Sequence, residues 1–254
     1  MRVLVCVKRV PAPGGKIPLT ADGQEVDSTF LGFTMSPHEE CAVEEAVRLV
    51  GREGGEVTVL TLGPKEAEEQ LRYAVSIKAN KVAHIITDTP DWDPQRTASA
   101  LAAGISSLEL EGGGFDLVLF GNESADSGGY QVGVRVAHQL DRPMVNGIKG
   151  LDLVEGRIVA RRAVEGGFEE YELPLPAMVG VKEGINLPSY PTMKGRLASK
   201  RAVVTVLQSS AEPGGQRKLE LVLPTEEKTE TLILGHGPEA APKVVQILSE
   251  LGVL

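Results

Sequence analysis

Apolar residues in the first half of the chain alternate between short strand-like runs and runs with helical spacing. The strand-like runs occur at residues 2–9, 56–62, 82–87 and 115–120, and the last is typical of a strand covered on both faces. Apolar positions three and four apart predict a helix after each of these strands, at residues 37–50, 65–79, 94–110 and 129–140. This alternation predicts an α/β fold with an open, mostly parallel sheet and helices on both faces.

The pattern changes after Pro143. Short strands separated by glycine turns are predicted at residues 151–154, 157–164, 168–173 and 177–181, consistent with an antiparallel ribbon. Residues 182–201 are rich in proline, glycine and cations and predict irregular structure. A linker (208–216), a short strand (219–223) and an amphipathic helix (238–251) follow. We therefore expect one Rossmann-like domain of the nucleotide-binding type, with its ribbon, over residues 1–207 and a C-terminal arm over residues 208–254.

Composition and charge narrow the classes of protein. The chain has 254 residues, 42% hydrophobic and 24% charged, as in ordinary globular proteins. Its formal net charge of -9 argues against a dedicated nucleic-acid binder. No apolar run is long enough to span a bilayer, and residues 1–7 read as a buried strand rather than a signal peptide. Cys6 and Cys41 match no zinc or redox spacing, so we expect buried, inert thiols in a reducing, cytoplasmic compartment.

Three segments are expected to meet at the carboxyl ends of the strands, where open α/β sheets bind ligands. They are the turn at residues 9–13, Leu62 with Gly63, and the loop at residues 121–133. In this loop, Gly128 and Gly129 allow the backbone to approach a ligand, and amides at the following helix start can receive a phosphate. The loop is neither a P-loop nor a Rossmann fingerprint. The alternative is a polar loop that caps the helix through Ser127 or Asp126.

Residues with catalytic potential are scattered. No metal spacing and no Ser/His/Asp set links the four histidines, which are His38, His84, His138 and His236. We expect His84 and His138 to be structural. The paired carboxylates Glu44–Glu45 and Glu68–Glu69 are expected on solvated helix faces. The sequence therefore predicts no catalytic residue and no metal site, and favours a protein that binds a nucleotide without turning it over.

Four stretches together resemble one family, the beta (small) subunits of electron-transfer flavoproteins. They are residues 3–10, the Met-Ser-Pro helix start with Ala-Val-Glu-Glu-Ala at 35–46, the loop at 125–133, and residues 159–179. The last stretch resembles the family signature, with a basic residue, an acidic-Gly-Gly turn and a downstream Leu-Pro-Ala. The stretches occur in the family's order and spacing and extend over most of the chain.

The resemblance implies an electron carrier subunit rather than an enzyme. Such a subunit forms a heterodimer with an alpha subunit that binds FAD, and it buries one AMP that has a structural role only. By motif position, the AMP contacts fall at Cys6, Ser36, Pro37, His38, Glu39, Leu62, Asp126, Ser127, Gly128, Gly129, Tyr130, Gln131, Val132, Gly133 and Val134. His38 stands where the family often has an aromatic residue near the flavin, so the resemblance also places it toward the FAD of the alpha subunit.

The resemblance also implies redox partners. Residues 184–190 resemble the family's recognition loop, which docks dehydrogenases, such as acyl-CoA dehydrogenases, by inserting one leucine. Ile185 occupies that leucine's position and Leu187 is a second candidate; the alternative is that Ile185 packs inward. Electrons would pass to a quinone-reducing oxidoreductase. The nearby cations Lys194, Arg196, Lys200 and Arg201 either form a solvated face or pair with acidic residues of the alpha subunit, and the C-terminal arm would pack on that subunit.

Other readings remain. Relatives that hold a second FAD in place of AMP typically have Asp-Gly-Asp-Thr-Ala-Gln in the loop, and residues 125–131 lack that Asp-Thr pair, which favours AMP. A stand-alone adenine-nucleotide-binding regulator of the stress-protein type would use the same sheet and loop, but it leaves the C-terminal arm unexplained. An adenylating enzyme would need Ser-Gly-Gly-x-Asp-Ser after the first strand, which residues 11–15 do not provide.

Overall fold

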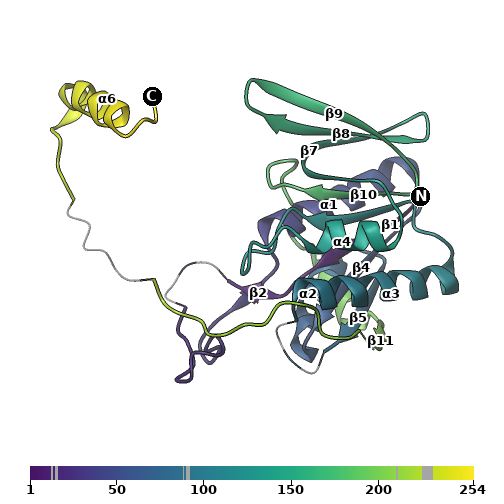
Figure 1. The fold of residues 1–254 in the computed structure, drawn as a ribbon. Coiled ribbons are helices and arrows are strands. Elements are labelled where there is room, and N and C mark those ends of the chain that lie inside the picture. Colours follow the sequence, from purple (N-terminus) through teal and green to yellow (C-terminus); the bar gives the residue numbers. More distant parts are fainter. Residues whose placement is uncertain (13, 15–16, 88, 90–91, 210, 225–230) are drawn as a thin grey trace.

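The computed structural model describes residues 1–12, 14, 17–87, 89, 92–209, 211–224 and 231–254. A nine-stranded sheet in the order β11-β5-β4-β1-β6-β10-β7-β8-β9 forms its centre (Figure 1). The parallel strands on one side are β1 (Arg2–Val7), β4 (Glu56–Gly63), β5 (Lys81–Ile86), β6 (Leu117–Gly121), β10 (Ala177–Val181) and β11 (Val204–Leu207). The antiparallel ribbon comprises β7 (Met144–Val154), β8 (Arg157–Val164) and β9 (Gly167–Pro174). The predicted fold class is confirmed.

Helices cover both faces of the sheet because side chains of the central strand alternate between two apolar clusters. Val3 and Val5 of β1 pack with α1 (Pro37–Glu53) and α2 (Glu68–Ser76), the second preceded by the 3-10 turn η1 (Lys65–Ala67). Leu4 and Cys6 pack with α3 (Pro94–Gly112) and α4 (Val132–Gln139). Both faces of β1 are thus buried, which explains its continuous apolar sequence.

Strand β10 corrects the predicted ribbon. It runs parallel to both β6 and β7 and lies between them, rather than pairing antiparallel with the preceding strand. All five of its residues are buried, as expected for a strand covered on both faces. Strand β7 also begins at Met144 rather than at residue 151, because it extends along β10 before it reaches the ribbon.

Two further elements were not predicted. Residues 182–201, expected to be irregular, contain α5 (Met193–Arg201), whose N-cap Thr192 accepts a hydrogen bond from the Gly195 amide. The helix has no buried residue, so it lacks the apolar stripe that reveals a helix in sequence. It approaches α2 so closely that a Cβ at Gly195 would lie 2.0 Å from the Ser76 carbonyl oxygen. Strand β11 adds an edge strand beside β5.

The C-terminal arm starts on the α/β body. The Ala211 carbonyl accepts from Arg96 Nε, and the Gly214 amide donates to Asp93. Residues 219–223 are not a strand, although the Leu221 amide donates to the Gly23 carbonyl. The last helix is present as the 3-10 turn η2 (Gly237–Ala240) and α6 (Ala241–Glu250), neither with a buried residue. In Figure 1, α6 lies away from the sheet. The proposed boundary at residues 207–208 remains a prediction.

A small antiparallel pair, β2 (Val10–Pro11) with β3 (Phe33–Thr34), lies outside the main sheet. Arg9 stacks on the Phe33 ring, with its guanidinium carbon 3.3 Å from the ring centre. Among the described residues, no helix combines the length and apolar character needed to cross a membrane.

Candidate functional site

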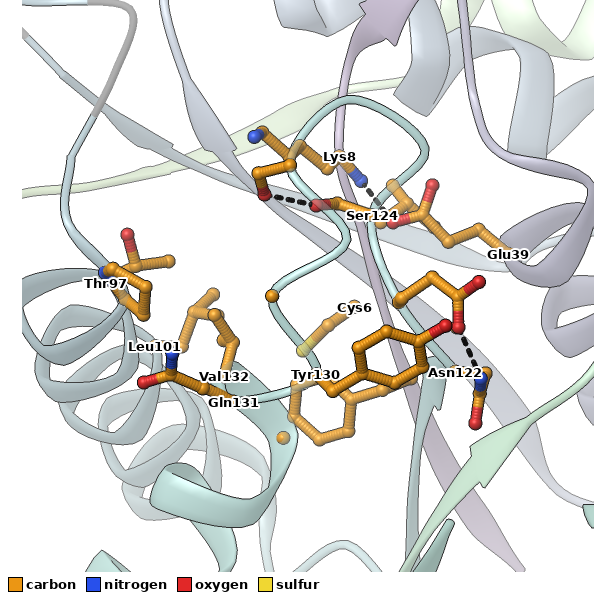
Figure 2. Close-up of a pocket in the computed structure, with 18 of the residues that line it drawn as sticks. Cys6, Lys8, Glu39, Thr97, Leu101, Asn122, Ser124, Tyr130, Gln131 and Val132 are labelled. Atoms are coloured by element: carbon orange, nitrogen blue, oxygen red, sulfur yellow. Dashed lines mark hydrogen bonds between the residues drawn. The ribbon is translucent and has the colours of Figure 1, made fainter. Parts of the chain in front are cut away.

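A crevice opens at the carboxyl ends of β1, β4 and β6, and encloses about 990 Å³ of space, part of it open solvent. In Figure 2, Thr97 and Leu101 of α3 lie on one side and Glu39 and Asn122 on the other, with Cys6 and Tyr130 between them and Lys8 above. The walls combine apolar side chains (Leu62, Leu101, Phe120) with polar groups of the loop after β6. The crevice thus lies where an open α/β sheet binds its ligand.

Nine of the residues chosen from the sequence line this crevice: Cys6, Glu39, Leu62, Ser127, Gly129, Tyr130, Gln131, Val132 and Gly133. The other predicted residues, Ser36, Pro37, His38, Asp126, Gly128 and Val134, do not line it. Pro13, at the end of the first predicted segment, lies outside the described residues. A role of any of these residues in nucleotide binding stays a prediction.

Several residues that line the crevice were not predicted from the sequence. Thr97 and Leu101 come from the first turns of α3, which follows β5 at the same sheet edge, and Trp92 directly precedes the N-cap of that helix. The carboxyl-end rule, applied to this helix as well, would have found them. Met144 and Asn146 also line the crevice. They belong to the part of β7 that the sequence pattern did not identify as a strand.

Some polar groups of the loop after β6 form hydrogen bonds with one another. The Ser127 amide donates to Asp126 Oδ1 (2.9 Å), the Gly128 amide to the Ser124 carbonyl (2.9 Å), and the two serine hydroxyls are 2.7 Å apart. Gly128 has a φ of +53°, which glycine adopts without strain, and this lets the chain turn into the crevice.

The start of α4 has no side-chain cap. Its N-cap is Gln131, whose side chain bonds to Arg135 instead, so the alternative in which Ser127 or Asp126 caps the helix is wrong. Within the described part of the chain, the backbone amides of residues 129–134 have no hydrogen-bond acceptor. These donors, together with the positive end of the helix dipole, can bind an anionic group such as a phosphate.

Glu39 closes the inner side of the crevice. It forms a capping box with Ser36 at the start of α1, and its Oε1 accepts a hydrogen bond from the Lys8 amide at 2.8 Å. Burial raises the Glu39 pKa to about 8, against the opposing effect of these backbone donors. Gly121 allows this packing, because a Cβ there would lie 2.8 Å from Glu39 Cγ. The carboxyl group is therefore a structural part of the crevice floor.

The thiols and histidines show no catalytic arrangement. Cys6 and Cys41 are both buried, as expected, and burial raises the pKa of the Cys6 thiol, which keeps it protonated. His84 is buried and bonds through Nε2 to the Gly63 carbonyl, a structural contact. The described residues contain no cluster of His, Cys, Asp and Glu suited to a metal ion.

His38 joins two segments beside the crevice. Its Nδ1 accepts a hydrogen bond from the Glu183 amide at 2.8 Å, and its Nε2 lies 3.3 Å from Glu123 Oε1. Because Nδ1 accepts, the neutral ring carries its hydrogen on Nε2 and donates it to Glu123. The Tyr130 hydroxyl donates a hydrogen bond to Glu123. This bond and the negative charge of the carboxylate raise the pKa of Tyr130.

The loop of residues 183–190, the exposed loop, follows β10. Ile185 is partly buried and packs against the main apolar core, in line with the inward-packing alternative. The side chain of Leu187 is 84% exposed and that of Tyr190 92% exposed. Docking of a partner stays a prediction for both Ile185 and Leu187, and of these two residues Leu187 is the accessible one.

The chain is similar to known proteins along most of its length. A family model described as "Electron transfer flavoprotein domain" matches residues 29–212. The electron transfer flavoprotein subunit beta of Mycobacterium tuberculosis (strain ATCC 25618 / H37Rv) is 34% identical over 211 residues, 81% of this chain and 78% of the relative. That of Bacillus subtilis (strain 168) is 30% identical over 258 residues, 98% and 97% of the two chains. That of Thermoanaerobacterium thermosaccharolyticum is 27% identical over 267 residues, which span both chains completely.

Proposed function

We propose a function from one premise: this chain belongs to the electron transfer flavoprotein family, as a beta subunit. It forms a heterodimer with an alpha subunit that carries FAD, and this pair accepts electrons from dehydrogenases. The beta chain itself binds and positions rather than catalyses. Its crevice holds one structural AMP, and its C-terminal arm packs on the alpha subunit.

The observation that carries the AMP proposal is the uncapped start of α4. The amides of residues 129–134 have no acceptor in the described structure and lie beside a crevice with apolar walls. A phosphate group satisfies such donors, and Leu62, Leu101 and Phe120 provide apolar surface for an adenosine. Lys8 adds a positive charge at the same wall.

The redox partners follow from the family. Acyl-CoA dehydrogenases or related enzymes donate electrons, and a quinone-reducing oxidoreductase receives them. The exposed Leu187 provides the apolar anchor of a small contact that forms and dissociates rapidly. His38 lies near the flavin of the alpha subunit. No residue of α6 is buried in the isolated chain, and the helix has apolar side chains at Val244, Val245 and Ile247 for the alpha subunit to cover.

Co-production with the flavin-binding large subunit tests the proposal. We expect a yellow heterodimer that releases one FAD and one AMP on denaturation, identified by mass. Two FAD molecules and no AMP would contradict the structural AMP but retain the carrier function. A colourless monomer or homodimer that does not bind the large subunit would overturn the carrier function. Reversible ATP binding by that homodimer would support the stress-protein alternative.

A further inference from the structure

One side of helix α1 carries a polar stripe that lies against the exposed loop. His38, Cys41, Glu44 and Arg48 follow one another at the three- and four-residue spacing of a helix face, and Glu45, four residues after Cys41, lies beside Glu44. The expectation that Glu44 and Glu45 are solvated is wrong, because their exposures are only 4% and 6%. A buried carboxylate is unfavourable unless hydrogen bonds compensate it, so the partners of these two groups show their role.

Glu44 binds the end of the exposed loop. Its Oε2 accepts from the Ser189 amide at 3.0 Å, and its Oε1 accepts from the Ser189 hydroxyl at 3.1 Å. Arg48 Nε donates to Glu44 Oε1 at 2.7 Å, and the same guanidinium donates through Nη2 to the Leu187 carbonyl at 3.0 Å. The Glu44–Arg48 pair therefore fixes the backbone on both sides of Pro188.

Glu45 binds the middle of the loop. Its Oε2 accepts from Asn186 Nδ2 at 2.9 Å, and the same amide group donates to the Cys41 carbonyl at 3.0 Å. The Asn186 side chain is buried, at 8% exposure. The Glu183 amide adds a hydrogen bond to His38, so residues of helix α1 bind the loop at positions 183, 186, 187 and 189.

The loop that α1 holds in place exposes two large side chains to solvent. Leu187 and Tyr190 are the exposed apolar and aromatic residues, and each neighbours a residue whose backbone or side chain α1 binds. A loop already held in one conformation loses little conformational entropy when a protein binds it. Such a loop suits a contact that must form quickly and still dissociate.

We propose that Glu44 and Glu45 are positioning residues, which hold the exposed loop in the conformation that a dehydrogenase recognises. Recognition of the loop by a dehydrogenase rests on the proposed electron carrier function. The fastening of the loop itself rests on the hydrogen bonds alone.

Hydrogen exchange and electron-transfer kinetics of the purified heterodimer test the proposal. The test variant is Glu44→Ala/Glu45→Ala, and Glu44→Gln/Glu45→Gln is the conservative variant, since glutamine keeps one acceptor. Glu53→Ala, at the exposed end of the same helix, is the matched control. Arg48→Ala serves as a second test if the double variant does not fold. The electron donor is an acyl-CoA dehydrogenase reduced with its acyl-CoA substrate, and flavin absorbance is the readout.

We expect amide exchange in residues 184–190 to accelerate roughly ten-fold or more in the double alanine variant, because several hydrogen bonds are lost. We also expect a roughly ten-fold rise in the KM for the heterodimer at unchanged kcat. The glutamine variant should recover much of both effects, and Glu53→Ala should match the wild type. Unchanged exchange in the double variant and in Arg48→Ala would overturn the fastening. Faster exchange with unchanged KM would overturn the positioning role.

A wild-type heterodimer that accepts no electrons from any acyl-CoA dehydrogenase would instead overturn the proposed donors. Because the exchange measurement needs no donor, the two failures are distinguishable.

Discussion

The Lys8 ammonium lies 2.6 Å from the Asp126 carboxylate and so connects the end of β1 to the loop after β6, beside the crevice. The two side chains are 36% and 25% exposed, so water screens the pair and its contribution to stability is small. Its position matters more than its strength. A bound phosphate near the loop would attract Lys8 and repel Asp126.

Substitution of either partner should therefore have opposite consequences for AMP binding. Lys8→Ala should raise the AMP dissociation constant about five-fold, equivalent to about 1 kcal/mol. Asp126→Asn should leave affinity unchanged or improve it, because the lysine is then free for the phosphate. Calorimetric titration of nucleotide-depleted heterodimer measures both. Equal weakening by both substitutions would show that the pair acts only by shaping the loop.

Gly121→Ala should destabilise the chain. A Cβ at this position would lie 2.8 Å from Glu39 Cγ and 3.3 Å from the Glu39 amide nitrogen, so β6 and the start of α1 would have to separate. Overpacking of this kind costs about 1 to 3 kcal/mol. Urea denaturation of the variant measures the change. Gly129→Ala is the control, since no heavy atom lies within 4 Å of its added Cβ, and a similar loss there would contradict the packing explanation.

Glu39 should make stability depend on pH. Burial raises its folded-state pKa to about 8 from 4.5, so the folded chain binds a proton that the unfolded chain has lost between these values. The favourable contribution is fully present below pH 4.5 and is lost as pH rises through 8. Relative to Glu39→Gln, which cannot titrate, the wild type should lose up to about 1.4 kcal/mol per pH unit in this window. Parallel stability curves for the two proteins from pH 5 to 8.5 would contradict this assignment.

Asp93 should couple the start of α3 to the C-terminal arm. Its side chain caps α3 by accepting from the Gln95 and Arg96 amides, and it also accepts from the Gly214 amide at 2.8 Å. Asp93→Ala should lower stability by about 1 kcal/mol through loss of the cap and should release the arm. Limited trypsin digestion after Arg217 reports the release. Asp93→Asn keeps an acceptor for the cap and should be intermediate, whereas unchanged digestion of the alanine variant would exclude the coupling.

The sequence pattern alone identified the elements whose apolar residues have a local period. Strands β1, β4, β5 and β6 are rich in apolar residues, and α1 and α3 carry apolar stripes, so each was located within a few residues. The loop after β6 was also identified, because a glycine-rich segment between a buried strand and a helix marks a sheet's carboxyl edge. The absence of a side-chain cap at the start of α4 could not be predicted, because Ser127 and Asp126 are residue types that often cap helices.

Tertiary structure decided the rest through contacts between residues that are distant in the chain. Strand β10 has the apolar sequence of a central strand, but only its pairing with β6 and β7 shows its direction. Glu44 and Glu45 look like solvated helix residues until Ser189 and Asn186, from a loop far along the chain, cover them. Periodicity records which face of an element is apolar. It holds no information on which distant polar group will compensate a buried charge, because that depends on how the folded segments meet.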